Sequence, residues 1–242
     1  MDGPLAQEAR ALLASARAWL TELVEEGVDD FERVAGAPAA AQPAAGERSP
    51  VAGARPTLAQ VREQLGECTR CRLCEGRTQI VFGDGDPQAA LMFIGEGPGE
   101  TEDLRGLPFV GRAGELLTQM IEKGLGIARR DVYICNIVKC RPPGNRTPLS
   151  DEVASCRPFL DGQIDAVRPR VIVALGKPAA SLLLGRDVAI TRARGTWHAY
   201  RGIPVMPTFH PAFVLRQYTE ENRRLVWSDL KAALERSRSS EG

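Results

Sequence analysis

The run RVIVALG, residues 170–176, is a short apolar segment that ends in glycine, and a helical pattern, PAASLLLG (178–185), follows it. Three further runs share its character: ALMFIG (90–95), DVYICNIV (131–138) and IPVMPTF (203–209). Two more helical patterns lie between these runs, GELLTQMIEKGLG (114–126) and DEVASCRPFLDGQIDAV (151–167). Near-continuous apolar strands that alternate with helices are typical of a parallel sheet covered on both faces. We therefore predict an α/β fold, a three-layer α/β/α sandwich with a short, mostly parallel central sheet.

The helix predicted at 151–167 has Ser150 as a candidate N-cap, with two acidic residues in its first turn. Residues 221–237 are predicted to form a closing helix. In an open sheet of this kind, ligands bind at the carboxyl ends of the strands. Four segments are therefore the places to look for chemistry: 95–103, 136–147, 176–178 and 209–216.

The beginning of the chain has a different character. Apolar residues recur there at steps of four and three (Leu5, Ala9, Leu12, Ala16, Trp19, Leu23), which predicts an amphipathic helical extension over 1–34. Residues 35–57 are rich in Ala, Pro and Gly and hold too little apolar area to offset ordering, so we predict a flexible linker. The extension either docks on another surface or is an inert solvated segment. The remaining residues, 58–237, are predicted to form one folded domain.

Composition narrows the class of protein. The chain has 31 basic and 31 acidic residues, so no global field attracts a polyanion. No apolar run reaches the roughly 18 residues of a membrane span, and no signal peptide is recognisable. A cytoplasmic location and a monomer are the default expectations. In that compartment the six cysteines are expected to be reduced, and metal ligation is favoured over disulfides.

Four cysteines have spacings that suit a metal site: Cys68, Cys71, Cys140 and Cys156. A CxxC pair lets two thiolates bind one metal from a single turn, and structural zinc is the commoner outcome for four thiolates. A 4Fe–4S cluster needs the same ligand set, so spacing leaves both open. Cys74 extends the pair into the start of a ferredoxin-like run, but the rest of that run is missing. Cys135 lies inside an apolar strand and is interpreted as a small buried hydrophobe.

The loop GEGPGE, residues 95–100, directly follows a predicted strand. A dinucleotide loop is the first alternative, but the glycine spacing is wrong, Pro98 removes an amide, and nearby carboxylates would repel a pyrophosphate. A glycine-rich turn with carboxylates instead suits water or a neutral heterocycle held against backbone N–H groups.

Three single residues are candidates for a role near that loop: Phe109, Asn136 and His210. Phe109 would ordinarily be a core residue, and His210 a structural donor. Asn136, however, lies in an apolar strand, where a buried amide must have its hydrogen bonds satisfied. The loop KCRPPGNR (139–146) is basic and stiffened by proline, and a solvated turn is its plain alternative.

Together these segments resemble the family 4 uracil-DNA glycosylases, the iron–sulfur branch of that superfamily. The resemblance spans about 60–235 and rests on an ordered set of motifs: CTRCRL (68–73), EGRT (75–78), GEGPGE (95–100), PFVG (108–111), NIVKCRPPGNRTP (136–148), Cys156, RGTW (194–197) and FHPAFVLR (209–216). It implies a DNA-repair enzyme that excises uracil from single- or double-stranded DNA. The competing hypothesis is a non-enzymatic, metal-stabilised nucleic-acid-binding or redox module.

The resemblance also implies roles for single residues. Cys68, Cys71, Cys140 and Cys156 take the positions of 4Fe–4S ligands. Glu96 and Gly97 fall in the loop that lines the uracil and water site, Glu102 helps to exclude a 5-methyl group, and Phe109 stacks on uracil. Asn136 reads the uracil edge and His210 faces O2, so Glu96, Asn136 and His210 are the candidate catalytic residues.

Two features qualify that assignment. Glu96 stands where the best-known branch of the superfamily has an aspartate-containing motif, which leaves its water-activating role open. A branch that traps DNA covalently has a basic insertion before its histidine, and MPTFH (206–210) has none. The expected DNA contacts are Arg141, Arg146 and Arg216 on phosphates, with Leu215 as a wedge between bases.

Overall fold

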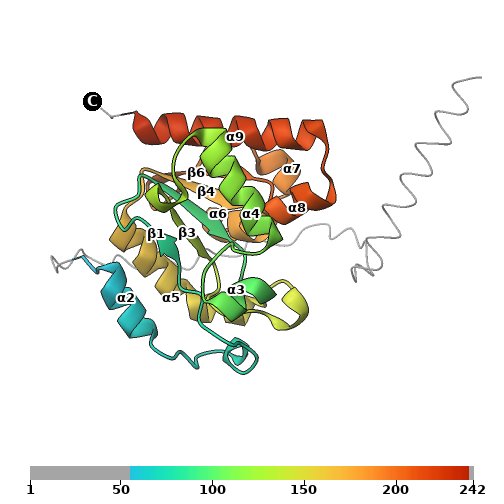
Figure 1. The fold of residues 1–242 in the computed structure, drawn as a ribbon. Helices are drawn as coiled ribbons and strands as arrows, with labels where there is room; N and C mark the ends of the chain where they lie inside the picture. Colours follow the sequence, from blue (N-terminus) through green and yellow to red (C-terminus); the bar gives the residue numbers. More distant parts are fainter. Residues whose placement is uncertain (1–54, 240–242) are drawn as a thin grey trace, which may run out of the picture. The chain divides into compact units, whose positions relative to one another are not determined.

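The computed structural model describes residues 55–239 (Figure 1). The helical extension predicted at 1–34, and all but the last three residues of the predicted linker, lie outside the described residues. The described part contains one six-stranded sheet with the order β1-β3-β2-β4-β6-β5. Its strands are β1 (Asp84–Gly85), β2 (Leu91–Gly95), β3 (Tyr133–Asn136), β4 (Val171–Leu175), β5 (His198–Tyr200) and β6 (Ile203–Thr208).

The four strands in the middle of this sheet are the four predicted apolar runs. Strands β3, β2, β4 and β6 are parallel, and β1 and β5 pair antiparallel at the two edges. Ile94 of β2 lies opposite Cys135 on one side and Ala174 on the other. The chain therefore places β3 and β4 on opposite sides of β2, which makes the carboxyl end of β2 a topological switch point.

Helices and short helical turns connect the strands. The helices are α2 (Leu58–Leu65), α3 (Glu100–Arg105), α4 (Arg112–Gln119), α5 (Ser150–Val167), α6 (Lys177–Leu184), α7 (Ile190–Ala193), α8 (Pro211–Arg216) and α9 (Glu220–Arg238). The shorter turns are η1 (Arg72–Cys74), the π-helical η2 (Met120–Leu125), η3 (Arg129–Asp131) and η4 (Pro143–Asn145).

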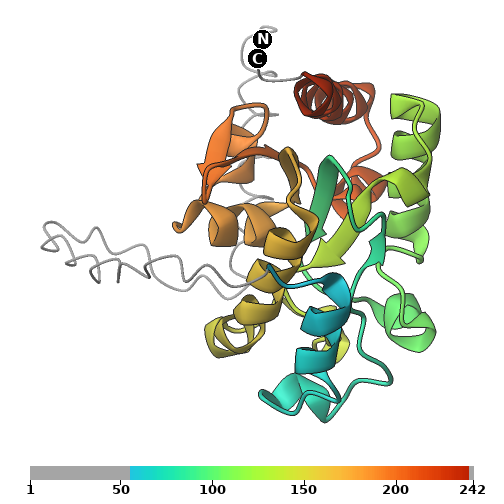
Figure 2. The same cartoon turned by 90° about the vertical axis from the view of Figure 1, so that its left-hand side faces the viewer.

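Two hydrophobic clusters cover the two faces of the sheet. Met92 and Ile94 of β2 belong to the cluster formed with α2, α5 and α6. Leu91 and Phe93 belong to the other cluster, formed with α4, η2 and α9. Because successive strand side chains point to opposite faces, β2 is buried on both sides. Figures 1 and 2 show α2 beside α5 and α9 on the far side of the sheet. The three-layer α/β/α prediction is confirmed.

The element boundaries differ from the predictions in two instructive places. Ser150 is the first residue of α5 rather than its N-cap, and the carboxylate of Glu152 accepts a hydrogen bond from the backbone N–H of Leu149 (2.7 Å). The predicted helix 114–126 starts two residues earlier and ends in the π-helical η2. Helix α2 was not predicted, because only Val61 and Leu65 of its residues are buried, too few to give a periodic pattern.

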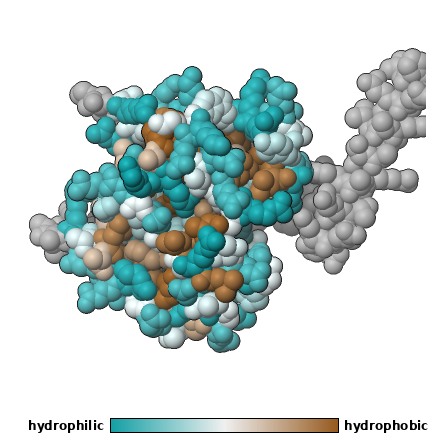
Figure 3. Space-filling view, viewed as in Figure 1, coloured by the Kyte–Doolittle hydropathy of each residue, from teal (hydrophilic) through white to brown (hydrophobic). Residues whose placement is uncertain are grey.

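The surface of the described part mixes polar and apolar residues. Within residues 55–239, no helix is both long and apolar enough to cross a membrane. Figure 3 shows hydrophobic residues in separate groups between hydrophilic ones on the face drawn there. The large exposed hydrophobic residues are Leu104, Leu107, Leu149, Tyr218 and Trp227.

Candidate active site

A cavity of about 580 Å³ lies at the carboxyl ends of the four parallel strands. All four segments predicted to carry chemistry contribute to its wall. The lining residues are Glu96, Gly97, Pro98, Gly99, Glu102, Phe109, Ala113, Asn136, Pro142, Asn145, Arg146, Gly176, Lys177, Pro178, Ile190, Phe209, His210, Ala212, Phe213 and Arg216. Its volume is within the range of about 300–1,000 Å³ usual for small-molecule pockets.

Gly95, the last residue of β2, is the point against which Phe109 and Asn136 both pack. A Cβ on Gly95 would lie 2.4 Å from Cζ of Phe109 and 2.5 Å from Oδ1 of Asn136. Any side chain here would displace both groups. Phe109 itself is buried and has a φ of 51°, an uncommon backbone conformation for a bulky residue. The strand end thus brings an aromatic ring and an amide to one wall of the cavity.

His210 also lines the cavity, two residues after the end of β6. Its ring centroid lies 5.6 Å from that of Phe109, with the planes tilted by 34°. Its Nδ1 accepts a hydrogen bond from the backbone N–H of Ala212 (3.1 Å), which caps α8. Gly176 has a φ of +86° and a Cβ there would lie 3.0 Å from Cβ of His210. Phe109, Asn136 and His210 therefore converge on one cavity.

The protonation state of His210 follows from these surroundings. Burial lowers the pKa of His210 to about 4, and the positive charge of Arg216 acts in the same direction, while Glu102 opposes it. Since Nδ1 accepts a hydrogen bond, the proton of the neutral imidazole is on Nε2. His210 is thus a neutral hydrogen-bond donor at physiological pH.

Asn136 has an unsatisfied atom. Its side chain is buried, and Oδ1 is one of the buried side-chain atoms without a hydrogen-bond partner among residues 55–239. Buried polar groups of this kind are rare and costly unless a ligand or water completes them. Because Asn136 lines the cavity, its Oδ1 is available to a donor on a bound molecule.

Two glutamates line the same cavity in different ways. The carboxylate of Glu102 accepts hydrogen bonds from the backbone N–H groups of Val110 (2.9 Å) and Gly111 (2.8 Å), so it fixes the loop that carries Phe109. Glu96 is half-buried; burial raises the pKa of its carboxyl, and a hydrogen bond with Thr147 lowers it in part. Gly97 lies beside Glu96, close to the side chains of Val138 and Pro142.

The end of β6 is held by a buried ion pair. Asp229 of α9 is almost fully buried and bonds to the guanidinium of Arg194, whose Nε lies 3.0 Å from Oδ2. The hydroxyl of Thr208, the last residue of β6, donates to the same carboxylate (2.6 Å). His210 follows Thr208 by two residues, so this network fixes the strand end from which the histidine projects.

The predicted DNA-contacting residues occupy different surroundings. Arg216 is exposed at the end of α8 and lines the cavity, and Leu215 beside it is half-buried. Arg146 also lines the cavity, but both of its terminal nitrogens bond to the buried carboxylate of Glu152 (2.8 and 2.7 Å). Arg141 donates to Asn145 (2.8 Å) and lies outside the cavity wall. Arg146 therefore has fewer free donors than the sequence suggests.

The four predicted ligand cysteines lie in one region. Burial raises the pKa of the Cys156 thiol to about 11, and the nearby thiols of Cys140 and Cys71 contribute. Burial also raises the pKa of the Cys140 thiol, and the nearby thiols of Cys71 and Cys68 act in the same direction. Within residues 55–239, no three His, Cys, Asp or Glu side chains are close enough to bind one metal ion as they stand.

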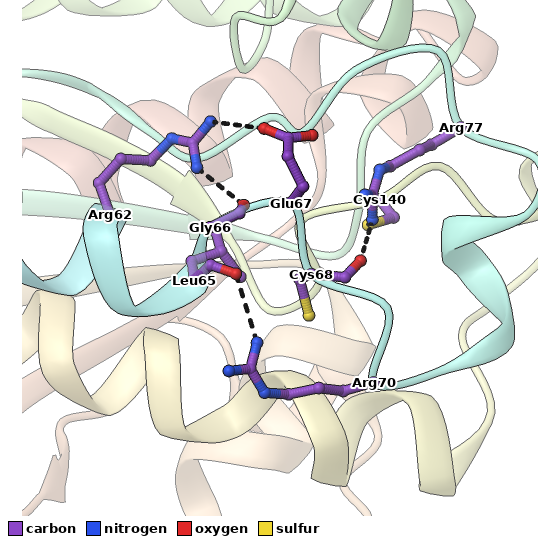
Figure 4. A network of polar contacts seen from close by, with 8 residues as sticks. All are labelled: Arg62, Leu65, Gly66, Glu67, Cys68, Arg70, Arg77 and Cys140. Carbon is purple, nitrogen blue, oxygen red and sulfur yellow. Dashed lines mark hydrogen bonds and ion pairs between the residues drawn. The ribbon is translucent and has the colours of Figure 1, made fainter.

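Arg77 joins two of these cysteines (Figure 4). Its Nη1 donates to the backbone oxygen of Cys68 (2.6 Å) and lies 3.3 Å from Sγ of Cys140. The two extra cysteines differ: Cys135 is fully buried in β3, as predicted, and Cys74 is half-buried at the end of η1.

Several wall residues were not predicted as single sites, among them Pro142, Lys177, Ile190 and Phe213. Pro142, Lys177 and Phe213 lie in segments that were predicted to carry chemistry, but nothing in the sequence singled out these residues, and Ile190 lies outside those segments. Gly95 was a signal for the close approach of Phe109 and Asn136, because a glycine at the end of an apolar strand leaves room for other groups.

The fold and the cavity define an α/β protein with a cavity at the switch point of its parallel strands. The pattern of the uracil DNA glycosylase superfamily matches residues 82–231. A type-4 uracil-DNA glycosylase of Thermotoga maritima is 50% identical over 177 residues, 72% of this chain and 91% of the relative. One from Sulfurisphaera tokodaii is 44% identical over 183 residues, 72% of this chain and 82% of the relative.

A type-5 uracil-DNA glycosylase of Pyrobaculum aerophilum is 40% identical over only 89 residues, 36% of this chain and 39% of the relative. The chain belongs to the uracil DNA glycosylase superfamily and, within it, to the type-4 family.

Proposed function

We propose that this chain is a DNA-repair hydrolase that flips uracil out of DNA and cleaves its N-glycosidic bond, leaving an abasic site. The observation that carries the proposal is the convergence of Phe109, Asn136 and His210 on one cavity of about 580 Å³. The relatives named type-4 uracil-DNA glycosylases support the same reaction.

Base recognition follows from the unsatisfied amide. Uracil presents an N3–H donor beside its O4 acceptor, and the carboxamide of Asn136 offers the complementary acceptor Oδ1 beside a donor. Cytosine presents an acceptor and a donor in the reverse order, which would leave buried groups unpaired. The ring of Phe109 supplies the stacking surface, worth about 1–3 kcal/mol per base.

Rejection of thymine is assigned to Glu102. Two backbone N–H groups hold its carboxylate, and Oε2 would lie 2.8 Å from a Cβ on Gly99. A wall fixed in this way cannot move aside for a 5-methyl group. Glu102 is proposed to discriminate by steric exclusion and by the cost of desolvating a carboxylate against a methyl group.

Bond cleavage needs stabilisation of a leaving uracil anion. As the C1′–N1 bond breaks, negative charge develops on uracil O2, and the Nε2–H of His210 is proposed to donate to it. A donor of this type is worth about 2.7–4 kcal/mol in comparable oxyanion sites. The neutral state is suitable because the proton is already placed on Nε2 before the base enters.

The water that attacks C1′ is assigned to the loop after β2. Glu96 and the backbone of Gly97 line the cavity there. When ionised, Glu96 can accept a hydrogen bond from the water and favour the positive charge that develops on the sugar. Because burial raises the pKa of Glu96, its carboxylate becomes protonated earlier than an exposed glutamate as the pH falls, and this role is then lost.

Extrusion of the base costs a few kcal/mol, less for single-stranded or mismatched uracil. Contacts of Arg141, Arg146 and Arg216 with phosphates, and a wedge formed by Leu215, are proposed to offset that cost. Single- and double-stranded DNA containing uracil are the proposed partners. A cytoplasmic monomer with reduced thiols fits this role.

We further propose that Cys68, Cys71, Cys140 and Cys156 hold a 4Fe–4S cluster, with structural zinc as the alternative. The chemistry of the donor set fits: the four thiols are electrostatic neighbours, and Arg77 donates to the sulfur of Cys140. Such a cluster would tie the segment before β1 to the loop after β3 and to α5. A brown protein with stoichiometric iron supports it, and a colourless protein with stoichiometric zinc contradicts it.

Incubation with an oligonucleotide that contains one uracil tests the proposed reaction. The expected product is free uracil and an alkali-labile abasic site, on single-stranded and duplex substrates. A protein that binds the oligonucleotide but never releases a base would be a non-enzymatic binding module, and the proposal would fail.

A further inference from the structure

A second, smaller cavity of about 190 Å³ adjoins the first. It is lined by Arg72, Leu73, Gly76, Arg141, Pro142, Pro143 and Gly144. Pro142 belongs to the walls of both cavities, so the two are neighbours on the surface. The small cavity lies between η1, which follows Cys71, and the loop after β3.

Two guanidinium groups face this cavity, and one of them has no assigned role. Arg72 is exposed, and its guanidinium makes no hydrogen bond or ion pair with any residue in the range 55–239. Arg141 is three-quarters buried and held by Asn145, with a longer ion pair to the exposed Glu100 (3.7 Å). One arginine is thus fixed in place and the other is free to close on a ligand.

Charge in this region favours an anion. Arg72 and Arg141 line the cavity, and Arg146 lies on the same loop as Arg141. The facing carboxylates are Glu152, whose lone pairs Arg146 occupies, and Glu100, which is exposed. Guanidinium groups recognise phosphate oxygens in bidentate fashion, so the two arginines that line this cavity suit a phosphodiester.

We propose that this cavity binds a DNA backbone phosphate next to the flipped nucleotide, with Arg72 and Arg141 as its ligands. The inference rests on the proposed function: because Pro142 lines both cavities, the small cavity lies beside the one proposed to hold the flipped uracil. It adds the cysteine-bearing segment to the DNA interface: Arg72 directly follows Cys71, so ordering of that segment would also order one phosphate ligand.

Salt-dependent binding of a uracil-containing oligonucleotide tests the proposal on the full-length protein. Arg72→Gln and Arg141→Gln should each weaken binding roughly tenfold and reduce the slope of log K against log salt by about 0.9 on duplex or 0.7 on single strands. Arg72→Lys should recover most of the slope. Arg130→Gln is the matched control, since Arg130 is exposed, lines neither cavity and pairs only loosely with Asp131 (3.9 Å).

Oligonucleotides with one neutral methylphosphonate at each position around the uracil identify the phosphate. The wild type should lose affinity at one position in particular, and Arg72→Gln should be insensitive to neutralisation at that position. Iron content and visible absorbance, measured on each variant, separate loss of a phosphate contact from damage next to Cys71.

An unchanged slope for Arg72→Gln, or weakening without any position-specific coupling, would overturn the phosphate site while uracil release by the wild type continues. Failure of the wild type to release uracil would instead remove the proposed function, whatever the salt dependence of binding.

Discussion

His210 is held in one tautomer by a backbone N–H group, and the role proposed for it depends on that tautomer. His210→Ser should retain a side-chain cap for α8 while removing the donor to O2. The single-turnover rate of uracil excision should fall by about 10²–10³ with oligonucleotide affinity nearly unchanged, because the donor acts mainly in the transition state. Equal loss of affinity and no loss of rate would place His210 outside the chemistry.

The lowered pKa of His210 also predicts how the stability of the fold and the rate of excision depend on pH. Its folded-state pKa, about 4, lies below its ordinary value of 6.5, so the unfolded chain binds the proton first as pH falls. The stability contributed by the neutral imidazole is complete above pH 6.5 and is lost as pH falls through about 4. Excision should accordingly show no histidine titration near 6.5.

A pH series of excision rates and of denaturant midpoints measures both effects. His210→Ser should be less sensitive to acid in its stability than the wild type. The matched control is a substitution of His198, the other histidine, which lies on β5 outside the cavity wall and should leave the excision profile unchanged.

Replacing Asn136 should affect excision much more than it affects stability. Because its Oδ1 has no partner within the described residues, Asn136→Ala should cost little stability, or none. Excision should nevertheless fall by roughly 5- to 150-fold, the equivalent of about 1–3 kcal/mol for an unsatisfied group on the base. Thermal midpoint and excision rate are measured on the same preparation.

Gln163→Ala is a useful comparison. Gln163 also has an unpartnered buried oxygen among the described residues, but its Nε2 bonds to Phe82 and Tyr133, and none of these three residues lines the cavity. That variant should lose stability and retain excision. The opposite pattern for the two residues would contradict the assignment of Asn136 to the site.

At the scale of elements, the end of β6 depends on α9. Asp229→Asn leaves Arg194 without its partner in a mostly buried position and weakens the bond to Thr208. Breaking one side of a buried ion pair typically costs about 3–5 kcal/mol. The free energy of unfolding should fall by that order, and the excision rate at saturating DNA should fall as well, since His210 loses its support.

Asp131→Asn is the control for this change. Asp131 pairs with Arg130 at 3.9 Å on the surface, where such pairs contribute about 0–1 kcal/mol. Denaturant titration of both variants separates the two cases. If Asp229→Asn were as stable as the control, the network would not hold the strand end.

The sequence was informative about elements with a strong pattern. Four apolar runs predicted the four parallel strands, and α5, α6 and α9 begin and end within a residue or so of their predictions. The short edge strands β1 and β5 and helices α3 and α8 were not predicted. These elements have six residues or fewer, so neither a helical period nor an alternation can be recognised in them.

At the scale of the molecule, the cysteine site should link three distant segments. Cys140→Ser should remove most of the bound iron and lower the thermal midpoint, because a lost ligand frees the segment around residue 68 from the loop after β3. Cys74→Ser, which changes a half-buried cysteine outside the proposed ligand set, should keep wild-type iron content. Equal iron loss in both would give Cys74 a ligand role.

The positions of the candidate site residues could be predicted from the sequence, but several of their contacts could not. The rule that ligands bind at strand carboxyl ends located the four segments, and Phe109, Asn136 and His210 do meet there. The pairing of Arg146 with Glu152 and the neutral state of His210 were not predictable. Both depend on contacts between residues that only the folded chain brings together.

A crystal structure of the protein bound to uracil-containing DNA tests most directly whether Phe109, Asn136 and His210 together hold a flipped uracil. We expect a flipped uracil stacked on Phe109, with N3–H donating to Oδ1 of Asn136 and O2 accepting from Nε2 of His210. A uracil bound elsewhere, or one that leaves Asn136 Oδ1 without a partner, would contradict it.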